Sequence, residues 1–259
     1  FTGYQKVANP DALAKFETAW GVKMNRTPGL MATECFPAMI DGRIKALFLF
    51  GEDPVRTDPD THHVIHALES LDFLVVFVCE ELFMTETAKY ADVILPGRSY
   101  AEKEGTFTNT ERRVQRVRKA VKGPDGPRLD TEVFAEIMRR MGYDQPSLSA
   151  SQIMEEIASL TPSYAGISHA RLDGAQVAGR GIQWPCPSED HSGTAIMHVG
   201  QFSRGKGGYS LAQYRPSAEL PNAEYPLMLM TGRVLAQYNA CAMTGRTEGL
   251  NEIAGESFI

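Results

Sequence analysis

The sequence predicts an α/β fold: a doubly wound, mainly parallel sheet similar to those that bind dinucleotides, then an irregular α+β connecting region and the start of a C-terminal β domain. Residues 44–50 and 73–79 are almost continuously apolar, as expected of parallel strands that are buried on both faces. Between them, residues 60–71 place apolar side chains at helical spacing. This alternation of strand, helix and strand indicates the parallel sheet.

A short helix is expected near the beginning of the chain, over residues 9–21. Asn9 suits the N-cap, Pro10 the first helical position and Gly21 the stop. The residues that follow, up to the first strand, contain Gly and Pro and are expected to form a loop.

The remaining elements are less regular. They are expected in this order: a short helix over residues 85–90, a third strand over 92–95, an irregular stretch over 97–130, helices over 129–140 and 151–160, a loop-rich region over 161–224 and an apolar strand from Tyr225 to Met230. Ser149 or Ser151 can cap the helix over 151–160. We therefore predict an α/β domain over 1–96, a helix- and loop-rich connecting region over 97–221 and the truncated start of a β domain over 222–259.

Composition excludes several classes of protein. The 259 residues include 26 Lys and Arg and 32 Asp and Glu, a net charge of −6, and no basic stripe accompanies them, so nucleic acid is not an expected partner. The longest apolar run, residues 73–79, is too short to cross a bilayer, so no membrane insertion is expected. The chain has no initiator Met or signal peptide and ends in an apolar stretch, which suggests a segment of a longer polypeptide.

The cysteines indicate the compartment. Cys35, Cys79, Cys186 and Cys241 lie far apart, without a Cys-x-x-Cys pair. This spacing excludes a zinc ribbon or an iron–sulfur cluster built from this chain alone. Four reduced thiols of a cytoplasmic protein are expected, and a periplasmic location stays open because the N-terminal part is expected to be missing.

The turn after the first strand is the most informative candidate for a ligand site. Residues 51–58 leave the carboxyl end of a parallel strand, where open α/β sheets bind ligands. Gly51 permits close approach of a ligand, and Asp53 and Thr57 offer polar groups for a sugar or a purine edge. The alternative is an ordinary strand-to-helix connection in which Asp forms the turn.

Polar residues follow the next two strands as well. Glu80 and Glu81 could bind ribose hydroxyls or a guanine edge, or could form a solvated acidic turn. Residues 96–99, which end in Ser99, leave the third strand. Three neighbouring strand ends of this kind predict a shared ligand crevice.

Two further motifs carry open alternatives. Thr231, Gly232 and Arg233 follow the predicted strand at 225–230 and could bind an anionic group, although a buried structural ion pair would use the same Arg. His62 and His66 share a helix face, which suits either a metal site or a polar surface; no further ligands are apparent, so no metal site is predicted.

Several ordered strings resemble the molybdopterin oxidoreductase family. They are residues 51–54, 80–96, 101–109 and 225–233. The strings at residues 3–5, 140–143, 183–186 and 242–246 resemble, within that family, the catalytic (alpha) subunit of formate dehydrogenases. The resemblance extends over essentially the whole chain.

The resemblance implies a bis-molybdopterin guanine dinucleotide cofactor with Mo or W. It implies that Gly51, Asp53 and Thr57 face one guanosine end, with Glu80, Glu81, Ser99 and Asp130 nearby. It also implies that the second dinucleotide is contacted by Thr231, Gly232, Arg233, Gln237 and Tyr238. Residues 102–107 would form a connecting loop that helps to seal the cofactor. The implied cofactor-binding residues are Gly51, Glu52, Asp53, Pro54, Thr57, Glu80, Glu81, Thr85, Ser99, Asp130, Thr231, Gly232, Arg233, Gln237 and Tyr238.

The family pattern also shows what this chain does not carry. Its members usually have Gln-Asp where this chain has Glu80 and Glu81, so a carboxylate is kept at Glu81 and an amide is lost at Glu80. The family's [4Fe–4S] cysteines and its metal-ligating Cys or selenocysteine precede the motif at residues 3–5. No catalytic residue is therefore assigned here, and the segment alone is expected to have no turnover. Formate as substrate and electron-transfer subunits as partners are implied for the whole enzyme.

Two other functions stay open. One is a non-catalytic structural or electron-relay subunit, like the large iron–sulfur subunit of respiratory NADH dehydrogenase. The other is a sibling molybdenum enzyme such as a nitrate reductase. The polar loops at residues 51–58 and 80–81 favour a cofactor-binding enzyme, and the strings at 183–186 and 242–245 count against a nitrate reductase.

Overall fold

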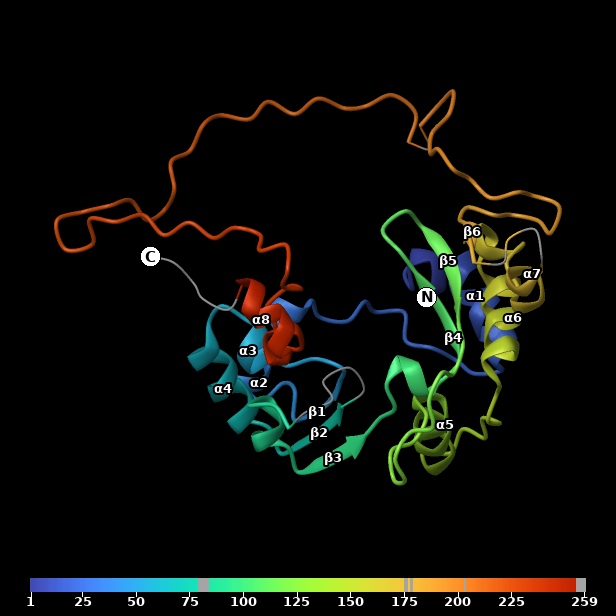
Figure 1. Ribbon diagram of the computed structural model, residues 1–259, viewed down its shortest axis with the longest axis horizontal. Helices are drawn as coiled ribbons and strands as arrows, with labels where there is room; N and C mark the ends of the chain where they lie inside the picture. Colours follow the sequence, from blue (N-terminus) through green and yellow to red (C-terminus); the bar gives the residue numbers. More distant parts are fainter. Residues whose placement is uncertain (79–83, 175–176, 178, 203, 255–259) are drawn as a thin grey trace. The chain divides into compact units, whose positions relative to one another are not determined.

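The computed structural model describes residues 1–78, 84–174, 177, 179–202 and 204–254. The chain forms two compact units, Phe1–Ala195 and Ile196–Ile259, and each is described by itself. Figure 1 labels the helices and strands along the chain.

The N-terminal helix is confirmed as the sequence predicts it. After the short 3-10 turn η1 (Thr2–Tyr4), α1 (Pro10–Trp20) begins at Asn9, whose side chain accepts hydrogen bonds from the backbone N–H groups of Asp11 and Ala12. Gly21 ends it in the left-handed conformation. These caps are local, which is why the sequence identifies them.

Helix α2 (Ala32–Ile40) lies where the sequence predicts a loop. Pro37 within the helix and the glycines and prolines around it conceal the pattern, because they normally end helices. Ala38 and Met39 are buried, so tertiary packing outweighs the local preference.

The predicted parallel α/β unit is present. β1 (Ala46–Phe50), β2 (Phe73–Val78) and β3 (Val93–Pro96) form a three-stranded parallel sheet in that order. The connections are α3 (Pro54–Thr57) with α4 (Thr61–Glu69), and the 3-10 turn η2 (Thr87–Tyr90), where the sequence predicts a helix over 85–90. Parallel connectivity with a helical crossover confirms the α/β class; the doubly wound arrangement stays a prediction.

Helices cover both faces of this sheet to different extents. On one face, Val64 and Leu68 of α4 pack with Leu74 and Val76 of β2. On the other, Phe77 packs against α5 (Asp130–Arg140). The prediction that residues 44–50 are buried on both faces is wrong, because Phe48 and Phe50 remain 38% and 40% exposed. β1 lies at the edge of this three-stranded sheet, and α5 covers that face only in part.

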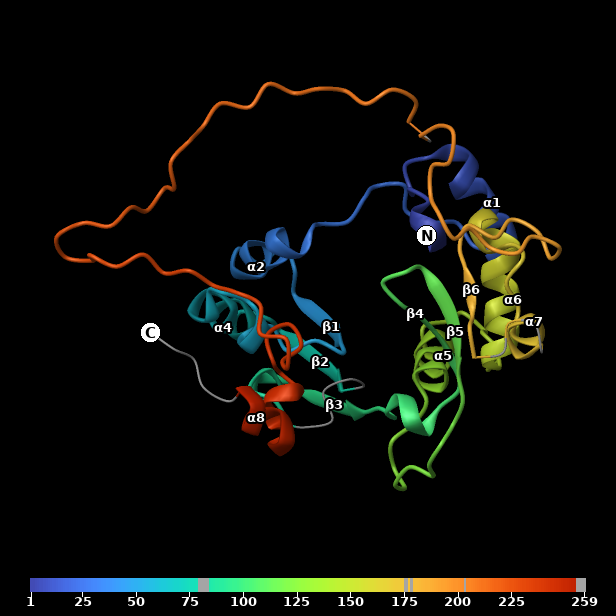
Figure 2. The same cartoon turned by 45° about the horizontal axis from the view of Figure 1, so that its top comes forward.

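A second sheet occupies part of the stretch predicted to be irregular. After η3 (Tyr100–Glu102), β4 (Gly105–Thr108) and β5 (Arg113–Val117) form an antiparallel hairpin, and β6 (Ile182–Gln183) pairs with β5 (Figure 2). In β5 apolar and polar residues alternate imperfectly, and Val114 is fully buried. The many charged side chains conceal this period of two.

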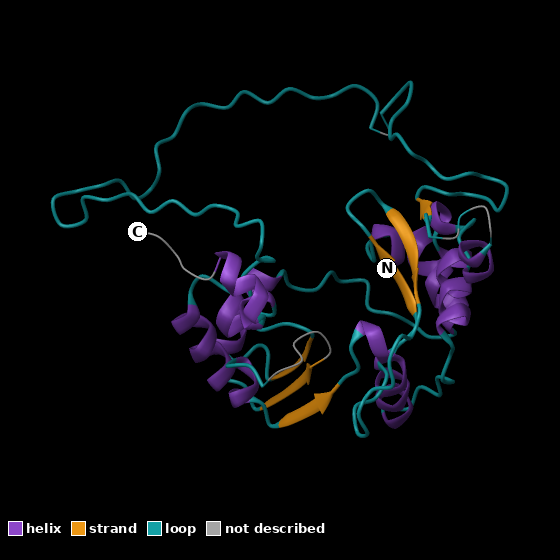
Figure 3. Cartoon of the chain, in the orientation of Figure 1, coloured by secondary structure: helices purple, strands orange, loops and turns teal. Residues whose placement is uncertain are grey.

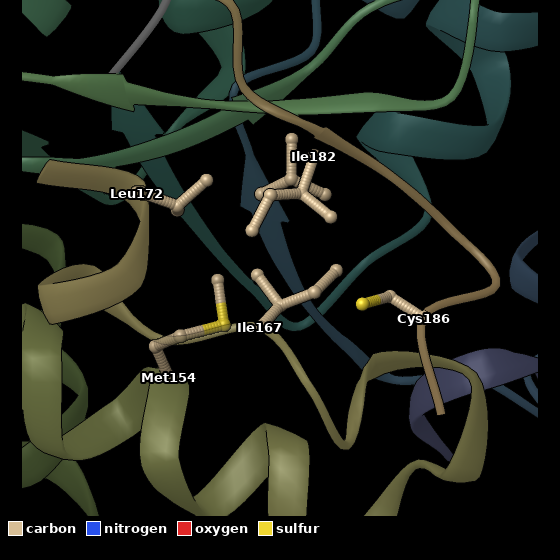
Figure 4. Packing of buried hydrophobic residues seen from close by; sticks show 6 residues of the cluster. Met154, Ile167, Leu172, Ile182 and Cys186 are labelled. Carbon is tan, nitrogen blue, oxygen red and sulfur yellow. The ribbon is translucent and has the colours of Figure 1, made fainter. Parts of the chain in front are cut away.

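The second sheet is covered by helices from the connecting region. α6 (Ala150–Leu160) is capped by Ser149, one of the two predicted caps, and η4 (Pro162–Tyr164) and α7 (His169–Asp173) follow. Figure 4 shows the core they share with β6, and its buried members are Val114, Met154, Ile167, Leu172, Ile182 and Cys186.

The second unit contains little regular structure in its described residues. Loops and turns extend from Ile196 to Met243 and are followed by η5 (Thr244–Arg246) and α8 (Glu248–Ala254) (Figure 3). The strand predicted over Tyr225–Met230 is absent, and so is the β character expected of the described part of 222–259. A strand needs a neighbouring strand for its backbone hydrogen bonds, and no described residue provides one here.

No helix in the part of the chain that the structure describes combines the length and the apolar character that a membrane span requires.

Candidate functional site

The candidate site begins at the turn that follows β1. Gly51 has φ 63°, in the left-handed region that favours glycine, and its N–H donates to the Phe77 carbonyl at 3.0 Å. Pro54 opens α3, and the side chains of Glu52 and Thr57 are exposed. The backbone therefore turns sharply at the carboxyl end of the sheet.

Asp53 is buried beneath this turn. It is 1% exposed, and its Oδ1 accepts a hydrogen bond from the Thr87 hydroxyl at 2.5 Å and a second from the Thr87 N–H at 3.3 Å. Its Oδ2 is also buried and has no hydrogen-bond partner among the described residues. Asp53 thus joins the β1–α3 turn to η2 and keeps one acceptor available.

Thr85 is also buried, at 3% exposure. Its hydroxyl accepts a hydrogen bond from the Ala88 N–H at 3.4 Å, within the segment that leads into η2. This contact supports the local turn.

A return of the chain brings Asp130 beside the end of β3. Gly97 and Arg128 form a parallel bridge, and the Arg98 side chain donates to the Pro127 carbonyl at 3.0 Å. Asp130 then begins α5, and its Oδ2 accepts from Lys103 Nζ at 2.5 Å in a pair that is about three-quarters buried, with side-chain exposures of 24% for Lys103 and 21% for Asp130.

Ser99 lies half-buried at the same edge. Its N–H donates to Glu102 Oε2 at 2.8 Å, which closes the turn of η3. The predicted neighbours Ser99 and Asp130 are thus both placed at the end of β3.

A cleft of about 540 Å³ opens at this edge of the sheet. Its volume suits a ligand the size of a nucleotide or larger. Its lining combines three aromatic side chains, three cationic ones and three carboxylates: Phe50, Tyr100, Phe107, Arg98, Lys103, Lys119, Glu102, Glu104 and Asp130. Residues 102–107 all line it, where the sequence predicts a loop that seals the cofactor. Flat rings and mixed charges suit a polar ligand with aromatic rings.

Of the predicted cofactor-binding residues that the structure describes in the first unit, Asp130 lines this cleft, whereas Gly51, Glu52, Asp53, Pro54, Thr57, Thr85 and Ser99 do not. Glu80 and Glu81 lie outside the described residues. Thr231, Gly232, Arg233, Gln237 and Tyr238 belong to the second unit. There, Thr231–Arg233 are exposed without regular structure, and the Gln237 amide donates to Asn251 and to the Ala254 carbonyl.

The histidines and cysteines that could bind a metal ion do not form a metal-binding group in the described structure. His62 and His66 are exposed on α4, and the described residues contain no group of three or more His, Cys, Asp or Glu arranged to hold a metal ion. Cys35 and Cys186 are free thiols, and Cys79 lies outside the described residues.

Thr87 and Lys103, which bind two of the predicted site residues, were missed by the sequence reasoning as individual side chains. Thr87 contacts Asp53, and Lys103 pairs with Asp130. Lys103 falls within the predicted sealing loop, so its charge was a usable signal. Thr87 had no local signal, since its partner is 34 residues away.

His169, the first residue of α7, is a buried histidine that lies outside the cleft and is costly to protonate. Burial, and after it the charge of Arg116, lowers the pKa of the imidazole below its ordinary value of 6.5. Asp173, Glu104 and Glu155 act in the opposite direction without reversing the shift.

We expect the free energy of unfolding to decrease as the pH falls through the ordinary histidine pKa of 6.5. The unfolded chain, with the higher histidine pKa, binds the proton more readily than the folded chain does. His169→Gln should therefore flatten the dependence of the urea midpoint on pH between about 7.5 and about 5. Exposed His62→Gln is the control and should leave the slope unchanged; equal slopes in His169→Gln and the unsubstituted protein would contradict the prediction.

Comparison with known proteins gives a consistent pattern. The family model described as Molybdopterin oxidoreductase matches residues 4–140. A Methanocaldococcus jannaschii protein named F420-dependent formate dehydrogenase subunit alpha is 44% identical over 266 residues, and a Methanococcus maripaludis protein named F420-dependent formate dehydrogenase 2 subunit alpha is 42% identical over 264. Each alignment covers 100% of this chain, which spans 37% of the length of either relative.

A search of solved structures adds little. Acetylene hydratase from Pelobacter acetylenicus aligns with a TM-score of 0.46 and 22% identity, over 64% of this chain and 23% of that one. A similarity at this level supports no argument about fold or function.

Proposed function

Since this chain belongs to the molybdopterin oxidoreductase family, we propose that it is part of the catalytic subunit of a formate dehydrogenase. The observation that carries this proposal is the alignment of the entire chain, at 44% identity, with a relative named as a formate dehydrogenase alpha subunit. The chain would contribute part of the binding site for a bis-molybdopterin guanine dinucleotide cofactor with Mo or W.

The residues present fit such a cofactor. A buried carboxylate oxygen without a partner costs roughly 1–3 kcal/mol unless a donor reaches it. Asp53 Oδ2 is such an acceptor among the described residues, and it lies in the turn at the carboxyl end of β1. Guanine carries N–H groups that would supply the missing donor.

The chain's residues would bind and orient the cofactor. Asp53 would accept a hydrogen bond from the guanine end of the cofactor. Lys103 would hold the side chain of Asp130 in place at the start of α5, near that end. Phe50, Tyr100 and Phe107 would shield a bound ring system from water. Gly51, which has no side chain, would let the cofactor approach the backbone closely at the end of β1, and Ser99 would lie near it at the end of β3. The second dinucleotide would be contacted by Thr231, Gly232, Arg233, Gln237 and Tyr238.

When bound, the cofactor supplies the redox chemistry: formate is converted to CO2 with the release of two electrons and one proton. The electrons would pass to a [4Fe–4S] cluster bound outside this chain, and then to partner subunits. The segment alone would have no turnover. A cytoplasmic location is proposed from the wide spacing of the four cysteines along the chain.

The proposal predicts the composition and activity of the whole polypeptide that contains this chain. Expressed with molybdate or tungstate, it should contain Mo or W by mass spectrometry and release a fluorescent oxidised pterin. It should reduce a viologen dye when formate is added. Because two relatives are named F420-dependent, coenzyme F420 is a second acceptor to test.

The alternative functions predict different results. A structural or electron-relay subunit would purify without pterin and without formate oxidation. A nitrate reductase would oxidise reduced viologen with nitrate and would not respond to formate. Either outcome would overturn the proposed function.

A further inference from the structure

We propose that Thr87 is a positioning residue that orients the Asp53 carboxylate toward the guanine end of the cofactor. This inference rests on the proposed function. It assigns a role to a side chain that does not itself need to contact the cofactor.

The two side chains form a buried pair between distant parts of the sequence. Thr87 is 0% exposed and Asp53 is 1% exposed. Asp53 precedes α3 after β1, and Thr87 begins η2 after β2, so the pair bridges two neighbouring strand ends. The hydroxyl lies 2.5 Å from Asp53 Oδ1, within the range of a strong hydrogen bond to a carboxylate.

The direction of this hydrogen bond is determined by a third group. The Val55 N–H donates to the Thr87 hydroxyl oxygen at 3.1 Å. A hydroxyl has one proton, and Asp53 Oδ1 is the carboxylate acceptor within reach, so Thr87 donates to Oδ1. The Thr87 N–H donates to the same oxygen at 3.3 Å.

The two carboxylate oxygens of Asp53 therefore have different roles. Oδ1 receives two donors from Thr87, whereas Oδ2 is buried and has no partner among the described residues. Fixing Oδ1 fixes the plane of the carboxylate, and with it the direction of Oδ2. The ligand chemistry that suits Oδ2 is an N–H donor, as on the edge of guanine.

Removal of the Thr87 hydroxyl should let the carboxylate rotate and weaken its hold on the cofactor. A hydrogen bond to a charged group is lost, and we expect roughly tenfold faster loss of cofactor. Thr87→Val removes the hydroxyl at nearly constant shape. Thr87→Ser keeps the donor and should retain cofactor within about twofold of the unsubstituted protein.

The test uses the whole polypeptide purified with its cofactor, and measures released pterin per polypeptide during dialysis, together with the melting temperature. Thr161→Val is the matched control, since Thr161 is 1% exposed and its hydroxyl lies 2.6 Å from that of Thr2. It should lower the melting temperature without changing the rate of pterin loss. If Thr87→Val does not fold, Thr87→Cys replaces it in the test. We expect Thr87→Cys to retain less pterin than Thr87→Ser.

A double-variant cycle separates positioning from general destabilisation. Asp53→Asn keeps the acceptor for Thr87 but removes the carboxylate, so Thr87→Val should have no further effect on pterin loss in that background. Additive effects would overturn the inference. The inference would also be overturned if Thr87→Val retained as much pterin as the unsubstituted protein. The same holds for Thr87→Cys where it replaces Thr87→Val. Absence of pterin from the unsubstituted protein would instead overturn the proposed function.

Discussion

Replacement of Phe77 by alanine is expected to lower the free energy of unfolding by about 3–5 kcal/mol. Phe77 is fully buried in β2, and its ring lies 5.3 Å from that of Phe50 in β1 and 6.0 Å from that of Phe134 in α5. Removing the ring leaves a cavity between the sheet and the helix that begins at Asp130. We therefore expect pterin retention to fall as well.

Phe73→Ala is the matched control for this prediction. Phe73 belongs to the same strand and points to the same face, but it is 45% exposed. It should cost less than about 1.5 kcal/mol, since much of its ring is already in water. Urea unfolding followed by circular dichroism measures both variants, and equal losses would show that Phe77 is not central to the core.

Replacement of Gly166 by alanine is the second large effect, expected at about 3 kcal/mol or more. A Cβ atom there would lie 1.9 Å from the Ser188 carbonyl oxygen and 2.9 Å from Cys186 Sγ. The Gly166 N–H also donates to the Cys186 carbonyl at 2.7 Å, so the two backbone segments cannot separate without losing this bond. The neighbouring core shown in Figure 4 would have to move.

Gly29→Ala separates this clash from the general effect of adding a methyl group. A Cβ atom at Gly29 would meet no atom within 4 Å. It should be neutral or stabilising by up to about 1 kcal/mol, because alanine restricts the unfolded chain. A Gly166→Ala variant that melts within a degree or two of Gly29→Ala would contradict the steric argument.

The regular elements were predictable where their signals are local. The limits of α1 are set by Asn9, Pro10 and Gly21, and apolar runs locate β1 and β2. The same reasoning missed α2 and the β4–β5 hairpin, whose proline and charged residues oppose their observed structure. It also predicted a strand at Tyr225–Met230, where the apolar residues remain exposed and pair with no strand among the described residues.

The candidate site was predictable as a location rather than as a set of contacts. The polar turns after β1 and β3 are where the sequence places them. Asp53 is buried rather than presented on the surface, because Thr87 returns to it from the end of another strand. The sequence also predicts that further residues join this site, and this stays a prediction for Glu80, Glu81, Thr231, Gly232, Arg233, Gln237 and Tyr238.

Family membership, the parallel α/β unit and the N-caps of α1 and α6 follow from the order of residues along the chain, because motifs and caps depend on near neighbours. The burial of Asp53, the pairing of Lys103 with Asp130 and the cleft that this pair lines follow from the folded chain. Burial and hydrogen-bond partners are set by segments that meet in space. Sequence separation does not reveal which segments these are.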